Sequence, residues 1–223
     1  MKLSIIVPVY NEIQGIEKIL KRLKEVPIHN KEIVVVDDGS TDGTREFLRT
    51  IQEPEIRVFF QPQNTGKGGA VRRGVMEATG EYIVIQDADL EYDPRDLARM
   101  FDLVLKGQAQ IVYGSRMLGR GTFLKSSYYA NRFLTFLTDV LYGARLTDME
   151  TCYKMMPRDV YLRLNIQANR FDMEPEITAK LLRYGYSIVE IPISYRGRTK
   201  GEGKKIGWRD GIQAIWTLVK YRI

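Results

Sequence analysis

Short apolar runs alternate with helical patterns over the first 115 residues of the chain. Continuous apolar runs predict strands that are buried on both faces, whereas apolar residues three or four positions apart predict amphipathic helices. The expected strands cover 3–9, 33–36, 57–60, 82–85 and 110–113, and the expected helices cover 13–24, a segment ending near 51, 69–78 and 94–105. Alternation of this kind predicts an α/β fold with a mostly parallel central sheet and helices on both faces.

Unusual polar loops follow the first four predicted strands. In parallel α/β sheets, ligands bind beyond the carboxyl ends of the strands, and these ends meet at one edge of the sheet. We therefore expect the loops to lie side by side and to form a binding site. They span residues 8–12, 37–43, 63–69 and 87–89.

Three carboxylates, Asp87, Asp89 and Glu91, follow the predicted strand 82–85. Hard divalent cations such as Mg²⁺ and Mn²⁺ prefer oxygen ligands and usually bind one or two carboxylates together with substrate phosphates. The motif therefore predicts a cation site that a phosphorylated substrate completes. The alternative is a capped turn that leads into the helix expected at Pro94.

Two further loops on this edge contain residue types that bind nucleotides. The acidic segment 37–40 could accept hydrogen bonds from a base or from ribose hydroxyls, although Asp, Gly and Ser also form ordinary turns. Residues 66–69 (Gly-Lys-Gly-Gly) precede a predicted helix, where glycines allow a phosphate to approach backbone N–H groups closely. Their spacing matches neither a Walker loop nor a dinucleotide-binding fingerprint.

After residue 115 the pattern changes to longer helices. Segment 127–142 carries an aromatic and apolar stripe, which predicts either core packing or insertion into a membrane interface. A last helix over 207–221 carries a similar stripe, for which core packing is favoured. A helix over 174–184 and a strand over 188–195 are also expected, and the basic, glycine-rich segment 196–206 suits a flexible lid over phosphates. The two stripes comprise Tyr129, Phe133, Phe136, Leu137, Val140 and Leu141, and Trp208, Ile212, Ile215, Trp216 and Val219.

The chain has 223 residues, a length that suits a single domain with a full hydrophobic core. Its formal net charge of +6 favours an anionic partner. The single cysteine, Cys152, excludes an internal disulfide framework and a cysteine-built zinc site, which favours an intracellular protein. No stretch reaches the roughly 20 apolar residues that a membrane span needs, and the N-terminus shows no signal-peptide pattern. We therefore expect any membrane contact to be peripheral.

Five motifs occur in order along the chain, namely Ser4–Glu12, Val35–Thr44, Asn64–Gly68, Asp87–Leu90 and Gly114–Arg116. In order and spacing they resemble the inverting family 2 glycosyltransferases. The second half, with residues 201–204 (Gly-Glu-Gly-Lys), is similar to the branch that contains dolichyl-phosphate mannose synthase and dolichyl-phosphate glucosyltransferase. The likeness covers nearly the whole chain.

The resemblance implies the glycosyltransferase A fold in one catalytic domain, with a nucleotide-sugar-binding half (1–115) and an acceptor-binding half (116–223). It implies GDP-mannose or UDP-glucose as donor, and Mg²⁺ or Mn²⁺ held by Asp89 and Glu91, although the mannose synthases carry glutamine at the position of Glu91. Asp89, Arg116 and Arg198 would be catalytic. The other residues that would bind the donor or a phosphate are Pro8, Tyr10, Glu12, Asp38, Lys67, Asp87, Ala88, Arg132 and Lys204.

The implied function is metal-dependent, inverting transfer of mannose or glucose to a polyprenyl or dolichyl phosphate, by a protein bound peripherally to the cytoplasmic membrane face. A phosphate monoester, with a second pKa of about 6, is already ionised near neutral pH, so that no protein base is required. Two alternatives stay open. A soluble or glycan hydroxyl acceptor would need a carboxylate base, for which Asp148 and Glu150 are candidates. A non-catalytic nucleotide-binding module would not be expected to keep every motif, and nucleic-acid binding would not explain the acidic loops.

Overall fold

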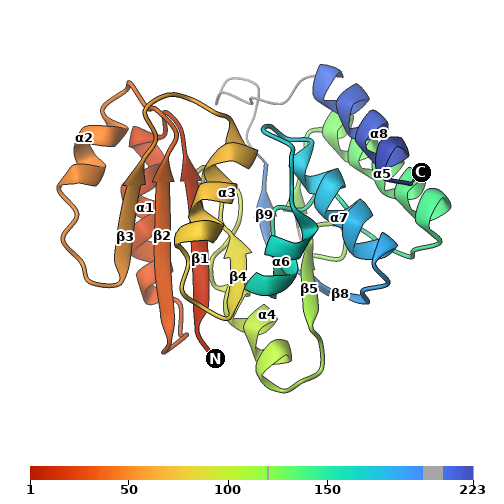
Figure 1. Cartoon of the computed structure of the whole chain (residues 1–223), viewed down its shortest axis with the longest axis horizontal. Helices are drawn as coiled ribbons and strands as arrows, with labels where there is room; N and C mark the ends of the chain where they lie inside the picture. Colours follow the sequence, from red (N-terminus) through yellow and green to blue (C-terminus); the bar gives the residue numbers. More distant parts are fainter. Residues whose placement is uncertain (120, 198–207, 223) are drawn as a thin grey trace.

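The computed structural model describes residues 1–119, 121–197 and 208–222, which form a seven-stranded sheet, a small two-stranded sheet and helices on both sides (Figure 1). The order of the large sheet is β3-β2-β1-β4-β7-β5-β8. The strands are β1 (Leu3–Val9), β2 (Lys31–Asp37), β3 (Ile56–Phe60), β4 (Tyr82–Ile85), β5 (Ile111–Ser115), β6 (Gly121–Thr122), β7 (Lys154–Pro157), β8 (Ile188–Pro192) and β9 (Tyr195–Arg196). The helices are α1 (Ile13–Glu25), α2 (Thr44–Arg49), α3 (Lys67–Glu77), α4 (Asp96–Leu105), α5 (Lys125–Tyr142), α6 (Arg158–Leu164), α7 (Met173–Arg183) and α8 (Trp208–Arg222). The predicted α/β class and mostly parallel sheet are confirmed.

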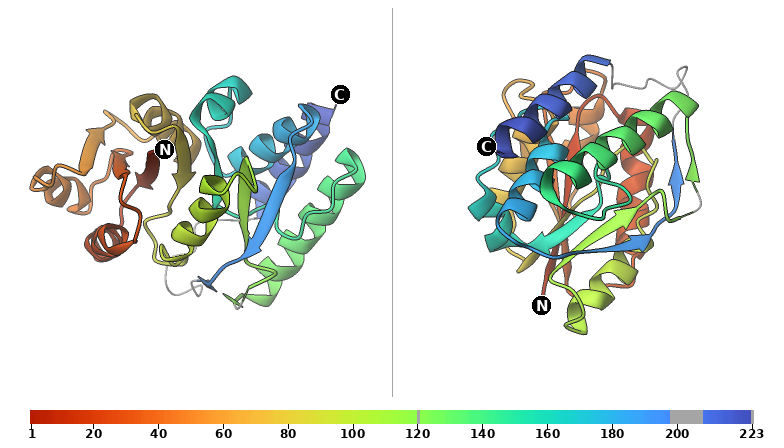
Figure 2. Two further views of the ribbon diagram at one scale, coloured as in Figure 1. Left: turned by 90° about the horizontal axis from the view of Figure 1, so that it is seen from below. Right: turned by 90° about the vertical axis from the view of Figure 1, so that its right-hand side faces the viewer.

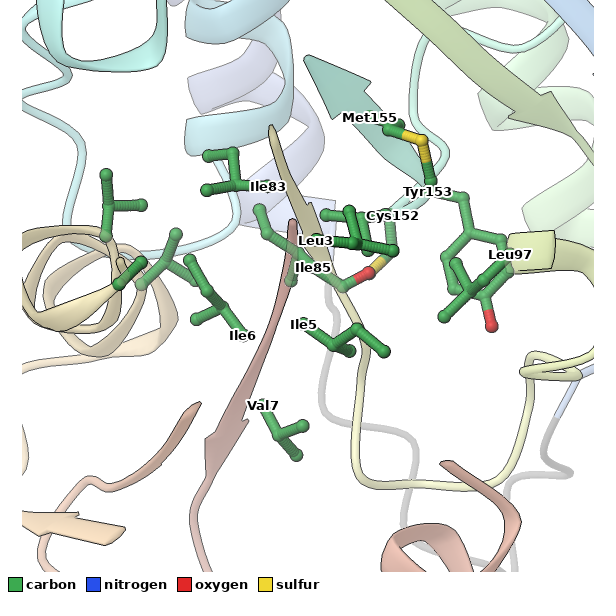
Figure 3. Close-up of a cluster of buried hydrophobic side chains, with 14 of the residues drawn as sticks. Leu3, Ile5, Ile6, Val7, Ile83, Ile85, Leu97, Cys152, Tyr153 and Met155 are labelled. Carbon is green, nitrogen blue, oxygen red and sulfur yellow. The ribbon is translucent and has the colours of Figure 1, made fainter. Parts of the chain in front are cut away.

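The central strands are buried on both faces because their residues are apolar and mostly β-branched. β1 pairs in parallel with β2 and with β4, and β2 pairs in parallel with β3. Side chains of β1 and β4, including Leu3, Ile5 and Ile85, lie with Cys152 and Tyr153 in one buried cluster (Figure 3). The single cysteine is therefore a core residue in this structure.

Strand β7 runs antiparallel between β4 and β5, and the sequence pattern did not predict it. Its residues, Lys-Met-Met-Pro, include no β-branched side chain and begin with a charge, so that they lack the usual strand signal. Because β7 is antiparallel, the loop before it reaches the edge at which β1 and β4 end. The Cys152 thiol marks this edge, since it donates a 3.4 Å hydrogen bond to the carbonyl of Ile85, the last residue of β4.

The segment 188–195, predicted as one strand, is divided into β8 and β9. The division falls where the Ser194 N–H donates a 2.7 Å hydrogen bond to the carboxylate of Asp96 on α4, which turns the chain out of the sheet. Beyond this turn β9 pairs in parallel with β6, and the two form the small second sheet.

Helices α5, α7 and α8 pack against one another on one side of the molecule (Figure 2). The inner face of α5 is formed partly by Thr135 and Thr138, which are 5% and 0% exposed. The Thr138 hydroxyl donates to the carbonyl of Leu134, and the Thr135 hydroxyl accepts a hydrogen bond from the Met149 N–H. Since their hydrogen bonds are satisfied locally, these small polar side chains can be buried where the three helices approach one another.

The outer faces of α5 and α8 expose large apolar side chains. On α5, Tyr129, Phe133, Phe136 and Val140 are 55–69% exposed. On α8, Ile212, Trp216 and Val219 are 57%, 65% and 37% exposed, so the core packing favoured for this stripe is wrong at these three positions. The correction has a physical reason: Ala214, Thr217 and Leu218 turn inward instead, and the side chain of Trp208 lies outside the described residues.

No described helix combines the length and the hydropathy that a membrane span requires.

Candidate active site

One cleft of about 760 Å³ lies beyond the carboxyl ends of β1, β2 and β4 and extends to α5 and α8. It brings together ten of the predicted site residues, a grouping that the parallel sheet imposes because these strand ends share one edge. Arg132 is exposed on α5 and is not part of the lining, and Arg198 and Lys204 lie outside the described residues. The ten that line the cleft are Pro8, Tyr10, Glu12, Asp38, Lys67, Asp87, Ala88, Asp89, Glu91 and Arg116.

The carboxylate of Asp38 holds the loop that follows β3. Its Oδ1 accepts hydrogen bonds from the Thr65 N–H at 2.8 Å and from the Thr65 hydroxyl at 2.9 Å, and its Oδ2 accepts the Gly66 N–H at 2.8 Å. The side chain of Gln61 donates a further bond at 2.9 Å. Asp38 therefore organises the rim of the cleft, in addition to facing the space in which a nucleoside was predicted.

The glycines of the same loop permit close backbone packing. Gly66 has a φ of +85°, and a Cβ there would lie 2.3 Å from the carbonyl oxygen of Asn169. The Gly68 N–H donates a 2.9 Å hydrogen bond to that same carbonyl. This N–H is therefore not available to a phosphate, so the predicted phosphate cradle does not include it.

Replacing Asp38 by asparagine is expected to lower the free energy of unfolding by about 1.5–3 kcal/mol, because the amide removes charge-assisted hydrogen bonds to the loop. Urea denaturation followed by circular dichroism measures the change. Asp102→Asn on α4 is a matched control, since Asp102 is exposed and pairs with Lys106 of the same helix. Equal stability of the Asp38 variant and the wild type would contradict the role given to this carboxylate.

Alternating charges form the floor of the cleft, where Lys67, Asp87 and Glu174 are part of the lining, and continue into the protein to Lys154. Lys67 Nζ lies 2.8 Å from Asp87 Oδ1 and 3.4 Å from Glu174 Oε1. The second oxygen of Glu174 lies 2.5 Å from Nζ of Lys154, whose side chain is fully buried. Burial opposes the ionised form of Lys67, but the carboxylates of Asp87 and Glu174 raise its pKa well above the usual value, so that it stays charged.

Sequence reasoning missed Glu174 and Lys154 as site residues. Glu174 was placed at the start of an expected helix, and Lys154 was not assigned to any element. The signal that could have marked them is a charge at a position that the structure buries, since lysine and glutamate are almost never fully buried unless paired. That signal depends on knowing the burial, which the sequence pattern did not show for β7.

Arg116 and Asp148 form a second buried pair beside this floor. The Arg116 side chain donates to both oxygens of Asp148, each at 2.7 Å, and the Arg116 N–H donates to Oδ2 at 2.9 Å. The guanidinium also lies 5.2 Å from the centre of the Tyr195 ring. Both Asp148 oxygens are thus engaged by Arg116, which makes Asp148 a poor general base and leaves Glu150 as the remaining carboxylate candidate.

The predicted cation ligands Asp89 and Glu91 both line the cleft. Oε2 of Glu91 accepts a 2.7 Å hydrogen bond from the Tyr195 hydroxyl, and Oδ1 of Asp89 accepts the Glu91 N–H at 3.1 Å. Within the described part of the chain, no three His, Cys, Asp or Glu side chains converge as a ready metal site. This donor set fits a cation that binds with one or two carboxylates and takes its other ligands from a diphosphate.

Solved structures define the class of fold. The chain superimposes on the S. aureus TarS 1–349 structure in complex with UDP-GlcNAc with a TM-score of 0.68 and 17% identity, over 99% of this chain and 66% of that one. It superimposes on glucosyl-3-phosphoglycerate synthase from Mycobacterium tuberculosis, in complex with Mn²⁺, UDP and phosphoglyceric acid, with a TM-score of 0.75 and 19% identity, over 99% and 78% of the two chains. The fold is the predicted glycosyltransferase A fold.

The chain belongs to glycosyl transferase family 2, whose sequence pattern matches residues 4–164. The prediction of a family 2 glycosyltransferase is therefore confirmed.

Three similar curated proteins are hexosyltransferases by name, and the names of two of them specify a polyprenyl or dolichol phosphate. The chain is 29% identical to the undecaprenyl-phosphate mannosyltransferase of Micrococcus luteus, over 100% of this chain and 99% of that protein. It is 29% identical to the dolichol-phosphate mannosyltransferase of Pyrococcus furiosus and 28% identical to the low-salt glycan biosynthesis hexosyltransferase Agl6 of Haloferax volcanii, with 99% of this chain covered in each case. It spans 64% and 53% of the length of these last two proteins.

Proposed function

We propose that this protein transfers a hexose, mannose or glucose, from a nucleoside diphosphate sugar to a polyprenyl phosphate at the cytoplasmic face of a membrane. The observation that carries the proposal is the continuity of the cleft. The cleft begins at the carboxylates beyond β4 and extends to α5 and α8, the two helices that expose aromatic side chains outward. A water-soluble donor and a lipid acceptor can thus meet in one site. The lipid-phosphate names of the similar curated proteins support this reading.

Helix α5 has the two faces that a lipid acceptor requires. Ser127, Asn131 and Leu134 line the cleft, whereas Phe133 and Phe136 point away from the protein. Exposed basic residues on the same two helices could contact lipid phosphates while the aromatic side chains insert among the acyl chains. These basic residues are Lys125, Arg132, Lys220 and Arg222. A helix packed entirely inside would have favoured a soluble acceptor, and α5 is not packed in that way.

The residues of the cleft suit displacement of a nucleoside diphosphate. Asp89 and Glu91 would hold Mg²⁺ or Mn²⁺, which when bound supplies positive charge to the leaving diphosphate. Lys67 and Arg116 add fixed positive charges, because Asp87 and Asp148 hold them in place before the donor arrives. The resemblance adds Arg132, Arg198 and Lys204 as further phosphate-binding residues.

The transfer itself exchanges one bond for another at the anomeric carbon. An oxygen of the acceptor phosphate approaches from the face opposite the diphosphate, the new C–O bond forms as the bond to the diphosphate oxygen breaks, and the configuration inverts. Since the acceptor phosphate is ionised near neutral pH, no proton has to be removed by the protein.

The second candidate function uses the same donor with a hydroxyl acceptor. The placement of Glu150 in the cleft favours this function over a nucleotide-binding module without turnover.

Sugar transfer to a short polyprenyl phosphate in mild detergent tests the proposal. GDP-mannose, UDP-glucose and UDP-N-acetylglucosamine are offered separately, with Mg²⁺ or Mn²⁺ and with or without a chelator. A lipid-linked product from one donor, lost with the chelator, is the expected result. Binding or slow hydrolysis of a nucleotide sugar without a lipid product would exclude the polyprenyl phosphate and leave the hydroxyl acceptor. A lipid product that persists in the chelator would contradict the metal requirement.

A further inference from the structure

Glu150 is a carboxylate of the cleft for which transfer to a phosphate acceptor gives no role. It lies in the loop before β7, and this loop reaches the edge of the sheet at which β1 and β4 end. Its side chain lines the cleft. Its Oε1 atom is shielded from solvent and has no hydrogen-bond partner within the described part of the chain. A buried acceptor without a donor is costly, so its presence at a ligand cleft needs an explanation.

The charges around Glu150 already balance without it. Lys154 on β7 pairs with Glu174 on α7, and Arg116 beyond β5 pairs with Asp148 in the same loop as Glu150. Two cations therefore face two other carboxylates, and Glu150 is the third carboxylate of the group. Burial raises the pKa of Glu150 to about 7, Lys154 and Arg116 oppose this shift, and Glu174 and Asp148 add to it. Oε1 of Glu150 is therefore a buried acceptor that forms no hydrogen bond with either of the two neighbouring cations.

The position of Glu150 in the sheet indicates which part of a donor it meets. Of the predicted nucleoside residues, Pro8 lies at the carboxyl end of β1 and Asp38 follows β2, and the predicted cation ligands follow β4. Glu150 precedes β7, the next strand beyond β4 in the order of the sheet. A donor whose nucleoside lies over β1 and β2 and whose diphosphate lies over β4 places its hexose over β7.

We propose that Glu150 accepts a hydrogen bond from a hydroxyl group of the donor hexose and thereby contributes to selection of the sugar. This inference rests on the proposed function only in requiring a nucleotide-sugar donor, and it is independent of the acceptor. A hydroxyl group of the hexose would donate a hydrogen bond to the buried oxygen of Glu150, for which the described part of the protein supplies no partner. A nucleotide sugar that lacks this hydroxyl would leave the oxygen without a hydrogen bond, and a polar site rejects analogues in this way.

Calorimetric titration without an acceptor tests the assignment. The probes are the nucleotide sugar that the wild type binds and the matching nucleoside diphosphate. Glu150→Leu is expected to bind the nucleotide sugar about 10- to 100-fold more weakly, because it loses one hydrogen bond to a charged group, and to bind the nucleoside diphosphate within about two-fold of the wild type. Glu150→Gln, whose amide oxygen still accepts, should lose less. Unchanged affinity of Glu150→Leu for the nucleotide sugar, or equal losses for both probes, would overturn the assignment.

Two further measurements separate this role from a structural one. The wild type should bind one monodeoxy analogue of the nucleotide sugar more weakly than the parent sugar, by the same factor by which Glu150→Leu weakens binding of the parent sugar. The Glu150→Leu variant should bind that analogue and the parent sugar with equal affinity. Replacement should not destabilise the fold, and the gain in melting temperature of Glu150→Gln should be larger at pH 8 than at pH 6, because the raised pKa makes the charged form unfavourable above about pH 7. If no deoxy analogue binds more weakly than the parent sugar, the assignment fails even if the variants do not fold. A wild type that binds no nucleotide sugar would instead overturn the proposed function.

Discussion

Asp89→Asn is expected to reduce sugar transfer by about 10²- to 10³-fold, while the protein folds normally. The predicted cation is attracted by carboxylate charge, and removal of one electrostatic contact to the leaving group typically costs a factor of this size. Asp89 lies in a loop beyond β4 and its side chain is only partly buried, so the core does not depend on it. Initial rates of lipid-linked product formation, measured over a range of Mg²⁺ and Mn²⁺ concentrations, give the effect.

Asp102→Asn is the matched control for this experiment. Asp102 is an exposed carboxylate on α4 that pairs with Lys106 in the same helix, and it is not part of the lining of the cleft. We expect its activity to stay within about two-fold of the wild type, as for most surface substitutions. If Asp89→Asn and Asp102→Asn were equally active, Asp89 could not be a ligand of a required cation.

Replacing Phe133, Phe136 and Trp216 together by serine is expected to weaken binding to vesicles by about 10²-fold or more. Each large apolar side chain that is transferred out of water contributes roughly 1.5–3 kcal/mol, and all three are more than half exposed in the protein. Sedimentation with vesicles that contain anionic lipids measures the loss. Because these side chains are exposed, the melting temperature should change little.

Met76→Ser and Leu105→Ser are suitable controls for the loss of apolar surface. These residues are 65% and 52% exposed, and they lie on α3 and α4, away from the exposed face of α5 and α8. Neither should affect vesicle binding. If the triple variant binds vesicles as the wild type does, the membrane contact is elsewhere. A wild-type dimer that becomes a monomer in the triple variant would identify this face as an interface between protein chains.

The sequence predicted the first half of the fold closely because its signals are local. The runs over β1 and β4 are short and, apart from Ser4, apolar, and they are followed by turn residues, a pattern that is typical of buried strands. The parallel arrangement then brings the loops after β1, β2 and β4 to one edge, which is why Asp38 and Asp89 line the same cleft. The roles given to these side chains stay predictions.

The floor of the cleft could not be derived in this way. Strand β7 lacks strand propensity in its own residues and exists because β4 and β5 hold it between them. Only the antiparallel direction of β7 places Glu150, which precedes it, at the edge of the sheet where β1 and β4 end. The buried pairs of Lys154 with Glu174 and of Arg116 with Asp148 join segments that are 20 and 32 residues apart, and no local pattern indicates such pairing.

The sequence by itself determined the α/β class, the edge at which ligands bind and the family to which the chain is assigned, because each depends on local hydrophobic pattern or on the order of short motifs. Only the tertiary structure decided which face of α5 is buried. An aromatic stripe is equally consistent with a core and with a membrane surface, and the choice depends on what the rest of the chain packs against it. In this fold α7 and α8 cover the threonine face of α5 and leave Phe133 and Phe136 exposed.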